Sequence, residues 1–230
     1  MYFRVFFVCF LVLFLETYHE TSEVFVFSLN PHAVPKILVS DDFYEKPDAV
    51  RQFALQQQFQ FNEKYHKGRR TNKQFLFPGV KERFEKLLQR RITVWDNHAH
   101  NGVFQICMAG DQLVYHSDLQ SYAAVVFLTP NAPLQAGLRT VRSKLTKLRR
   151  PPTEQDAKAA NVDTTTLLSL TYGNKLLDGT AWDTVDLIGN VYNRLVIWDA
   201  QLIHAAADYF GHDNETSRLF QIFFFDVEAL

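Results

Sequence analysis

The sequence is poor in the residue types that staple small secreted proteins or attract nucleic acids. Only two cysteines occur among 230 residues, and Cys9 and Cys107 cannot build a disulfide framework. An excess of one charge is also absent, because 24 basic side chains are balanced by 25 acidic ones, which argues against a general nucleic-acid-binding protein. Charged residues make up 21% of the chain and are evenly spread, which excludes a polytopic membrane protein. We therefore expect one globular domain.

Long apolar runs are scarce, and the run at residues 5–15 is shorter than the roughly 20 residues of a membrane span. It follows Arg4 and has the length of a signal-peptide core, but no small-residue cleavage site follows it. A signal, an anchor, a buried strand and a misassigned start all stay open. We treat residues 1–33 as an apolar N-terminal segment and linker, and expect membrane contact only if residues 5–15 act as an anchor. A cytoplasmic location is favoured, with secretion as the alternative if residues 1–20 are a signal.

From residue 34 onward, two helices are expected ahead of a series of strands. A short strand at 36–39 precedes a helix that begins near Pro47, and a second helix should follow Gly79, with apolar residues at helical spacing from Val80 to Ile92. Short β-type runs then occupy 103–108, 113–116, 122–128, 193–198, 202–205 and 218–227, separated by turn residues. The pattern predicts a mainly β domain at 34–230 with flanking helices, an antiparallel sandwich or barrel, and an insertion at about 139–190.

Three residues suggest a metal site. His116 and Asp118 are two residues apart at the end of an expected strand, so both side chains should leave the same face, and His204 lies in another expected strand. Two histidines and one carboxylate on one face of an octahedral ion leave three coordination positions open, as in non-haem Fe(II) oxygenases. We therefore predict that His116, Asp118 and His204 bind a metal.

Arg218 supports the same interpretation. It begins a strongly apolar strand at 218–225, where a buried guanidinium is costly unless an anion meets it. A guanidinium presents a planar fork that suits a carboxylate. A dicarboxylate co-substrate held by Arg218 at one end and by the metal at the other would explain both features.

With these residues in place, the sequence resembles the Fe(II)/2-oxoglutarate-dependent dioxygenases, in the branch that looks like prolyl 4-hydroxylase domains. The matching segments, which span most of residues 36–228, are 113–118, 123–128, 193–205 and 217–219. The resemblance implies a double-stranded β-helix, a jelly roll or cupin-like barrel, with His116, Asp118 and His204 as catalytic iron ligands. It also implies that Arg218 binds the distal carboxylate of 2-oxoglutarate, although that branch often has a lysine in this role.

The strand at 122–128 should contribute to the site. The family pattern calls for a hydroxyl donor near the co-substrate, and Tyr122 is our candidate for it. Either Ala123, Val125 and Phe127 or the alternate residues of the strand would supply an apolar wall around the reaction.

The function implied by the resemblance is a non-haem iron hydroxylase that uses Fe(II) and 2-oxoglutarate. Oxidative decarboxylation of 2-oxoglutarate would be coupled to hydroxylation of a small-molecule or peptidyl substrate that the sequence does not identify. The alternative is a non-catalytic β-barrel binding module that keeps the fold, with or without a structural metal. Because ligation needs neutral imidazoles and an ionised Asp118, iron affinity should fall below about pH 6.

Other histidines have weaker claims to a metal. His98 and His100 form the H-x-H pair with which many cupins begin their site, but no glutamate follows, so we interpret them as turn residues, with the pocket rim as the alternative. His212 is expected in a solvated loop. Asn214 begins a segment similar to the N-x-T-x-R signature of nucleic-acid dealkylating enzymes, yet no basic surface accompanies it, and we expect no nucleic acid partner.

The basic run at residues 139–150 also has two interpretations. It can be a solvated helix or loop, or it can be a lid over the barrel that favours an acidic substrate. Cys107 is expected to be a buried strand residue without a catalytic base.

Overall fold

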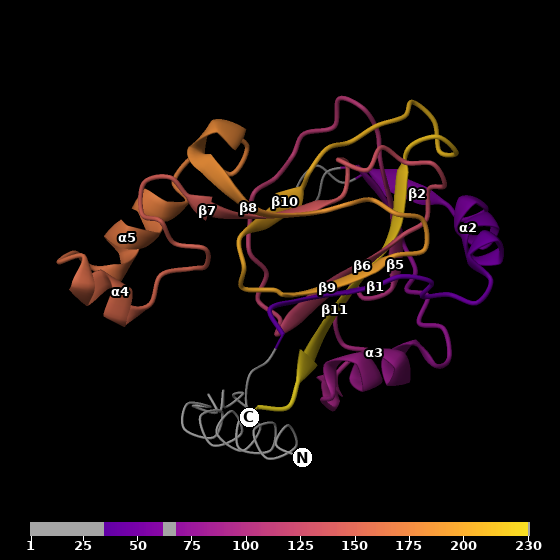
Figure 1. Ribbon diagram of the computed structural model, residues 1–230, viewed down its shortest axis with the longest axis horizontal. Helices are drawn as coiled ribbons and strands as arrows, with labels where there is room; N and C mark the ends of the chain where they lie inside the picture. Colours follow the sequence, from indigo (N-terminus) through magenta and orange to yellow (C-terminus); the bar gives the residue numbers. More distant parts are fainter. Residues whose placement is uncertain (1–34, 62–67, 230) are drawn as a thin grey trace, which may run out of the picture. The chain divides into compact units, whose positions relative to one another are not determined.

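The computed structural model describes residues 35–61 and 68–229. The expectations for residues 1–33 lie outside these described ranges. Within them, two antiparallel sheets face each other, and helices flank the pair (Figure 1).

The larger sheet forms one side of the fold. It contains β1 (Ile37–Ser40), β9 (Leu195–Asp199), β6 (Tyr122–Phe127), β11 (Arg218–Val227), β5 (Val103–Cys107), β3 (Arg69–Thr71) and β2 (Phe59–Phe61) in that order, and β4 (Ile92–Val94) pairs with β11. All residues of β6 and β5 are buried, because both faces of these central strands are covered.

The smaller sheet covers the inner face of the larger one. Its order is β10 (His204–Ala206), β7 (Leu138–Ser143) and β8 (Trp182–Ile188). β7 and β8 stand at the two ends of the expected insertion, so both ends of that segment are paired strands. Residues 144–181 between them hold α4 (Glu154–Ala159), α5 (Thr164–Thr171) and the 3-10 turn η1 (Gly179–Ala181).

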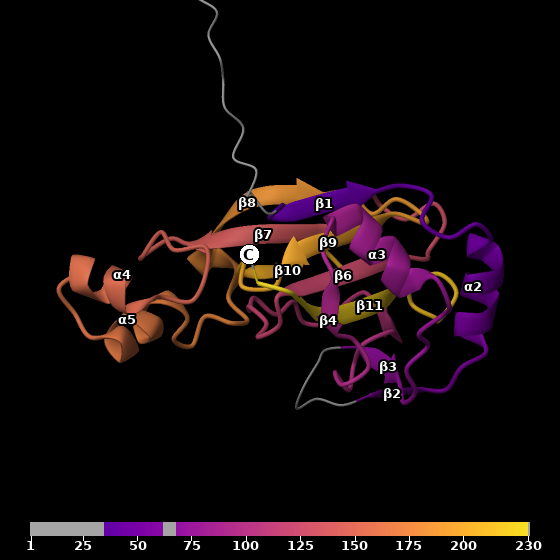
Figure 2. The same ribbon diagram turned by 90° about the horizontal axis from the view of Figure 1, so that it is seen from below.

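Two further helices precede most of the strands. α2 (Pro47–Leu55) begins with a proline in its first turn, where the missing N–H costs nothing. α3 (Val80–Leu88) lies over the larger sheet (Figure 2). Its residues Val80, Phe84 and Leu88 are buried in the core layer on that side. It ends sooner than the sequence predicted, because Gln89 takes a left-handed backbone with φ 53°, and Ile92 therefore belongs to β4 rather than to the helix.

The alternation of strand residues divides the core into two layers. Ala124 and Val126 face the α3 side, where Phe84 and Phe223 pack. The other residues of the same strands face the smaller sheet and line the space between the sheets; they include Val103, Cys107, Ala123, Val125, Phe127, Trp198, Phe220 and Ile222. Side chains of this second group of residues therefore point into the space between the two sheets.

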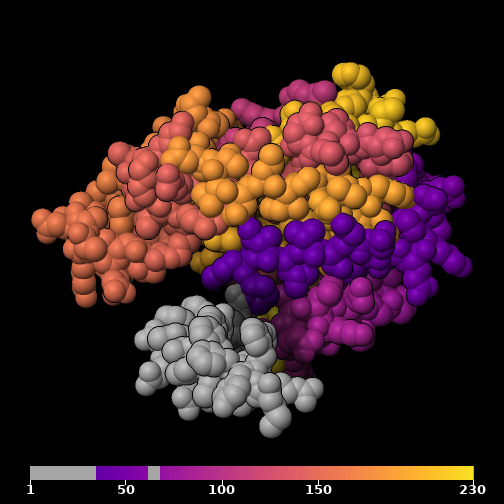
Figure 3. All heavy atoms as spheres, viewed as in Figure 1, coloured from indigo at the N-terminus to yellow at the C-terminus, as the bar shows by residue number. Residues whose placement is uncertain are grey.

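Several side chains of the basic run at 139–150 pair with carboxylates. Arg142 of β7 pairs with Asp183 of β8 at 3.1 Å. Arg149, which follows β7, pairs with Asp186 of β8 at 2.8 Å. Arg150 pairs with Asp156 at 2.6 Å in α4. Figure 3 shows the insertion gathered at one end of this unit, away from α2. The run is thus partly a strand and partly an ion-paired anchor of the insertion.

Two smaller expectations are corrected. Residues 113–116 do not form a strand; only His116 makes an isolated bridge, to His204. The expected strand at 202–205 begins at His204. No helix in the described ranges has both the length and the apolar character needed to cross a membrane.

Candidate metal centre and its cavity

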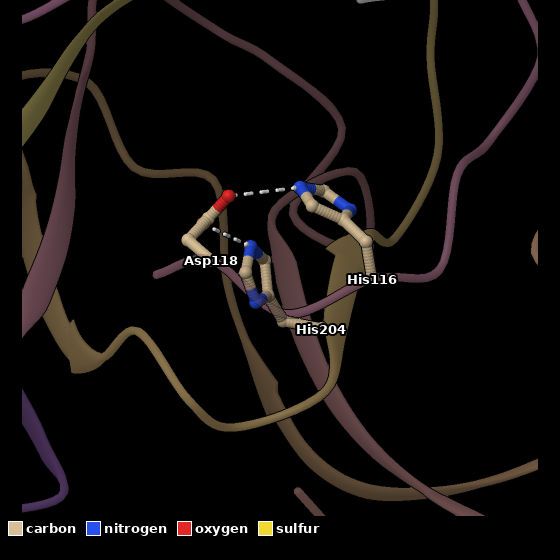
Figure 4. A group of neighbouring side chains, drawn as sticks. All are labelled: His116, Asp118 and His204. Atoms are coloured by element: carbon tan, nitrogen blue, oxygen red, sulfur yellow. Dashed lines mark ion pairs between the residues drawn. The ribbon is translucent and has the colours of Figure 1, made fainter. Parts of the chain in front are cut away.

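The structure brings His116, Asp118 and His204 together. One potential ligand atom from each lies within 4.8 Å of the others. His116 Nε2 is 3.6 Å from Asp118 Oδ1, and His204 Nε2 is 3.3 Å from Asp118 Oδ2 (Figure 4). The residues that the sequence singled out as metal ligands therefore form one cluster.

Backbone hydrogen bonds hold the three residues in place. The amide of His116 donates to the carbonyl of His204 at 3.0 Å, and the amide of His204 donates to the carbonyl of His116 at 2.8 Å. The amide of Asp118 donates to the carbonyl of Ala200 at 2.8 Å. The bridge thus links two segments that are far apart in the chain and fixes the approach of their side chains.

The hydrogen bonds of the imidazoles also define their tautomers. His116 Nδ1 lies 3.1 Å from the carbonyl oxygen of Val114, and His204 Nδ1 lies 2.8 Å from that of Leu202. Because a carbonyl oxygen only accepts, each Nδ1 carries the proton, and each neutral ring presents an Nε2 lone pair toward Asp118. Two lone pairs and a carboxylate that face one another are the donor set of a divalent cation.

Ionisation is consistent with that donor set. Burial, followed by the neighbouring His204, lowers the pKa of His116, which keeps its ring neutral near pH 7. The His116 side chain is 44% exposed and lines the cavity described next. Burial alone would raise the pKa of Asp118. At the low pH where a carboxyl titrates, the histidine rings carry both protons, and the hydrogen bond and charge of His204, followed by the charges of His116 and Arg70, outweigh burial and lower this pKa, so the carboxylate is ionised near pH 7.

The cluster opens into a cavity of about 360 Å³ between the two sheets. Its wall combines residues of β5, β6, β9 and β11 with the three clustered residues and the segment 97–100. Asp118 is the only carboxylate among the described residues that line it. The volume suits one or two small organic molecules.

Arg218 lies in this cavity and is 2% exposed. Its Nε donates to the carbonyl of Ala136 at 3.1 Å, and its Nη2 donates to that of Gly137 at 3.2 Å. The guanidinium also lies 4.3 Å from the ring centroid of Phe220. Burial lowers the pKa of Arg218, which shows how little solvent compensates its charge. No carboxylate among the described residues pairs with it, so the cation is available to an anion in the cavity.

Several residues that line the cavity were missed by the sequence analysis, among them Tyr209, Trp198 and Arg70. Tyr209 lies beside Arg218, whose guanidinium is 5.7 Å from its ring centroid, and burial raises the pKa of its hydroxyl. Trp198 packs its ring 5.0 Å from that of His204, and its buried Nε1 has no hydrogen-bond partner among the described residues. Arg70, on the short strand β3, is the third. A tyrosine five residues after His204 was a visible signal, but three-residue strands such as β3 have no clear pattern.

Tyr122 is not brought to the site. Its side chain belongs to the core layer on the α3 side, where it stacks on Phe225 at 5.9 Å, and its hydroxyl donates to the carbonyl of Pro35 at 3.0 Å. The strand alternation explains the correction: Ala123, Val125 and Phe127 face the cavity side, and Tyr122 points the other way.

The remaining candidates have clear positions. His98 and His100 line the cavity, as the rim alternative expected, and His98 Nε2 is 3.2 Å from Asp226 Oδ2. His212 is exposed in a loop. Cys107 is buried on β5, and burial raises the pKa of its thiol.

Comparison with known proteins finds likeness only in structure. No protein-family model and no curated protein matches the chain. HygX from Streptomyces hygroscopicus, with nickel, 2-oxoglutarate and hygromycin B bound, is 10% identical, with a TM-score of 0.51 over 84% of this chain and 83% of its own. A second HygX structure, with nickel and 2-oxoglutarate bound, is 11% identical, with a TM-score of 0.51 over 86% and 87%. A Pseudomonas putida prolyl-4-hydroxylase is 14% identical over 84% of this chain and 94% of its own, with a TM-score of 0.44.

At these identities the likeness to HygX establishes the fold. The chain has the double-stranded β-helix fold that HygX has, and the fold expected from the sequence is confirmed.

Proposed function

We propose that the protein is an Fe(II)/2-oxoglutarate-dependent dioxygenase that hydroxylates a small-molecule or peptidyl substrate. The observation that carries the proposal is the convergence of two Nε2 lone pairs and the Asp118 carboxylate beside a cavity that also contains a buried Arg218. Iron and co-substrate would together supply the oxidising chemistry. The protein's own residues would bind and orient the iron and the co-substrate, and they would exclude bulk water.

The metal ligands would be His116, Asp118 and His204. Their Nδ1 protons are held by backbone carbonyls, so the rings need neither rotate nor lose a proton to bind an ion. Three protein ligands on one side leave the cavity side open, which a purely structural site would not need.

The co-substrate would lie between the metal ligands and Arg218. Arg218 donates from Nε and Nη2 to the carbonyls of Ala136 and Gly137, which orients the fork and leaves both N–H groups of Nη1 and the second N–H of Nη2 for a ligand. We assign the distal carboxylate of 2-oxoglutarate to this guanidinium, with Tyr209 beside it in the place that Tyr122 was expected to take. The apolar residues Val125 and Phe220 line the same cavity and would keep bulk water out.

The decisive experiment measures turnover. The protein is loaded anaerobically with Fe(II), then given oxygen and 2-oxoglutarate, and succinate is quantified. We expect succinate from the wild type and none above background from His116→Ala. His212→Ala, which changes an exposed loop histidine, is the matched control and should equal the wild type.

A binding measurement, taken together with turnover, separates an enzyme from a non-catalytic module that binds a metal. Removal of one ligand in His116→Ala should weaken Ni(II) binding by more than about a hundredfold, since even changes behind the ligands cost about 10–100-fold. Tight metal binding without succinate release, with and without candidate substrates, would favour the non-catalytic binding module.

A further inference from the structure

The cavity contains a second guanidinium that the proposed function does not use. Arg70 lines the cavity from β3, and its Nε donates to Gln105 Oε1 at 2.6 Å. Among the described residues, Gln105 is the only hydrogen-bond partner of the Arg70 side chain, so Nη1 and Nη2 remain to meet a ligand. Burial lowers the pKa of Arg70, as expected for a cation removed from water without a paired carboxylate.

The sheet register shows where the two arginines stand. β5 lies between β11 and β3, and Arg218 pairs with Cys107 of β5 while Arg70 pairs with Gln105. Gln105 and Cys107 are two residues apart and therefore face the same side. The two guanidiniums thus reach the cavity from opposite sides of β5. In the proposed function the metal and Arg218 hold the two ends of the co-substrate, which leaves Arg70 without an assigned ligand.

Charge in the cavity points to an anionic partner for Arg70. Asp118 is the only carboxylate among its described lining residues, and it would be a metal ligand. The positive charge of a divalent ion, Arg218 and Arg70 together exceeds the negative charge of Asp118 and a dicarboxylate. The cavity therefore stays positive when the metal and the co-substrate are bound. A half-buried guanidinium without a carboxylate partner is unfavourable, and a carboxylate that accepts from the Arg70 fork would stabilise it.

We infer that Arg70 binds a carboxylate of the primary substrate, and that this substrate is a small carboxylic acid. The inference rests on the proposed function, in which the metal and Arg218 hold the co-substrate. Gln105 then acts as a positioning residue, because its side chain accepts from Arg70 Nε and its Nε2 contacts Cys107 Sγ at 3.2 Å. His98 and His100 line the same cavity and add hydrogen-bonding groups to its wall.

The test uses binding rather than turnover. Zinc-loaded protein receives 2-oxoglutarate at the lowest concentration that saturates its site. Matched acids and amides, from acetate and acetamide to N-acetylleucine and N-acetylleucinamide, are then titrated at low ionic strength and followed by saturation-transfer NMR. In at least one pair we expect the acid to bind about tenfold more tightly than its amide, as a charge-assisted hydrogen bond would give.

Variants assign the preference to Arg70. Arg70→Met should abolish the preference for the acid while 2-oxoglutarate affinity stays within about twofold, and Arg70→Lys, which keeps the charge, should retain part of it. Arg69→Met changes the exposed neighbour on the same strand and should behave as the wild type. Circular dichroism checks that each variant is folded.

Three results would overturn the inference. Equal binding of acid and amide in every pair would show that no anion site exists. A loss of 2-oxoglutarate affinity in Arg70→Met as large as the loss for the acid would assign Arg70 to the co-substrate. Both of these leave the proposed function standing. Failure of the zinc-loaded wild type to bind 2-oxoglutarate would remove the proposed function, and this inference with it.

Discussion

The two imidazoles of the candidate metal centre share one local device. Each Nδ1 meets the carbonyl oxygen of the residue two positions earlier, Val114 for His116 and Leu202 for His204. The backbone that positions each ring therefore also determines which nitrogen is protonated. At the residue scale the site is prepared for a cation before any ion binds.

A prediction at this scale concerns the hydroxyl of Tyr209. Tyr209→Phe keeps the ring beside Arg218 but removes the hydroxyl, and we expect 2-oxoglutarate to bind about three- to tenfold more weakly, the worth of one hydrogen bond. Metal affinity should not change. Calorimetric titration of the metal-free protein with nickel measures the metal affinity, and titration of the nickel-loaded protein with 2-oxoglutarate measures the co-substrate affinity.

Tyr122→Phe is the control, because the Tyr122 hydroxyl donates to Pro35 on the far side of the sheet. It should leave both affinities at the wild-type value. If Tyr122→Phe weakened 2-oxoglutarate binding and Tyr209→Phe did not, the assignment of the two tyrosines would be reversed.

At the scale of single elements, α3 is held by aromatic packing. Phe84 is fully buried and packs its ring within 5.1–5.7 Å of Phe223, Phe225, Phe43 and Trp95. The burial of this one side chain joins the helix to β11 and to the residue that follows β4.

We therefore expect Phe84→Ala to lower the free energy of unfolding by about 3–5 kcal/mol, because it removes transfer energy and leaves a cavity. Urea denaturation followed by circular dichroism measures the change. Phe61→Ala, at a side chain that is 54% exposed, should change stability by less than about 0.5 kcal/mol. Similar losses in the two variants would contradict the packing argument.

The start of α4 depends on an ionised carboxylate. Asp156 accepts from the Thr153 backbone and hydroxyl in a capping box and pairs with Arg150. The Arg150 hydrogen bond, followed by those of Thr153, lowers the pKa of Asp156 below its ordinary 3.8. Because the folded-state pKa is the lower one, the stabilisation is complete above about pH 5 and is lost as the pH falls through the folded value.

We expect Asp156→Asn to lower the melting temperature at pH 7, and the difference from wild type to shrink as the pH falls below 3.8. Calorimetric melting between pH 7 and 3 measures it. Glu154→Gln, in the same first turn but outside the capping box, should show a smaller and flatter difference. Equal curves for the two variants would exclude the capping box as the cause.

At the scale of the whole molecule, the site depends on how closely the two sheets approach. Gly137 precedes β7, and its carbonyl accepts from Arg218 of the larger sheet. A Cβ at this position would lie 1.9 Å from the carbonyl oxygen of Ile188 and 2.9 Å from the amide nitrogen of Asn190, both backbone atoms that cannot rotate away. Glycine here allows the smaller sheet to approach the arginine.

Gly137→Ala should therefore destabilise the protein by about 1–3 kcal/mol and weaken 2-oxoglutarate binding, because the carbonyl that orients Arg218 must move. Thermal unfolding and calorimetric titration give the two readouts. Gly189→Ala is the matched control in the facing segment, since a Cβ there meets its nearest atoms at 3.5 and 3.6 Å, an ordinary contact. Unchanged 2-oxoglutarate affinity in a destabilised Gly137→Ala would show that the carbonyl does not orient Arg218.

Much of this arrangement follows from local sequence rules. Alternation in extended chain placed His116 and Asp118 on one side, and the cost of a lone guanidinium in an apolar strand marked Arg218. These rules depend on spacing and residue type alone, so they hold before any tertiary contact forms. The same is true of α2 and of the apolar face of α3, although the end of α3 at Gln89 was not visible in the pattern.

Only the tertiary structure decided which face of each strand turns inward and which distant residues meet. Alternation in a strand leaves its two faces equivalent. Val125 faces the cavity and Tyr122 faces α3 because the helix packs on one face of the sheet and the smaller sheet covers the other. Arg70 and Tyr209 reach the cavity through pairings and loops between segments far apart in the chain. The sequence by itself thus determined the donor chemistry of the site, because donor type and spacing are local, whereas the shape and charge of its cavity arise only when the sheets face each other.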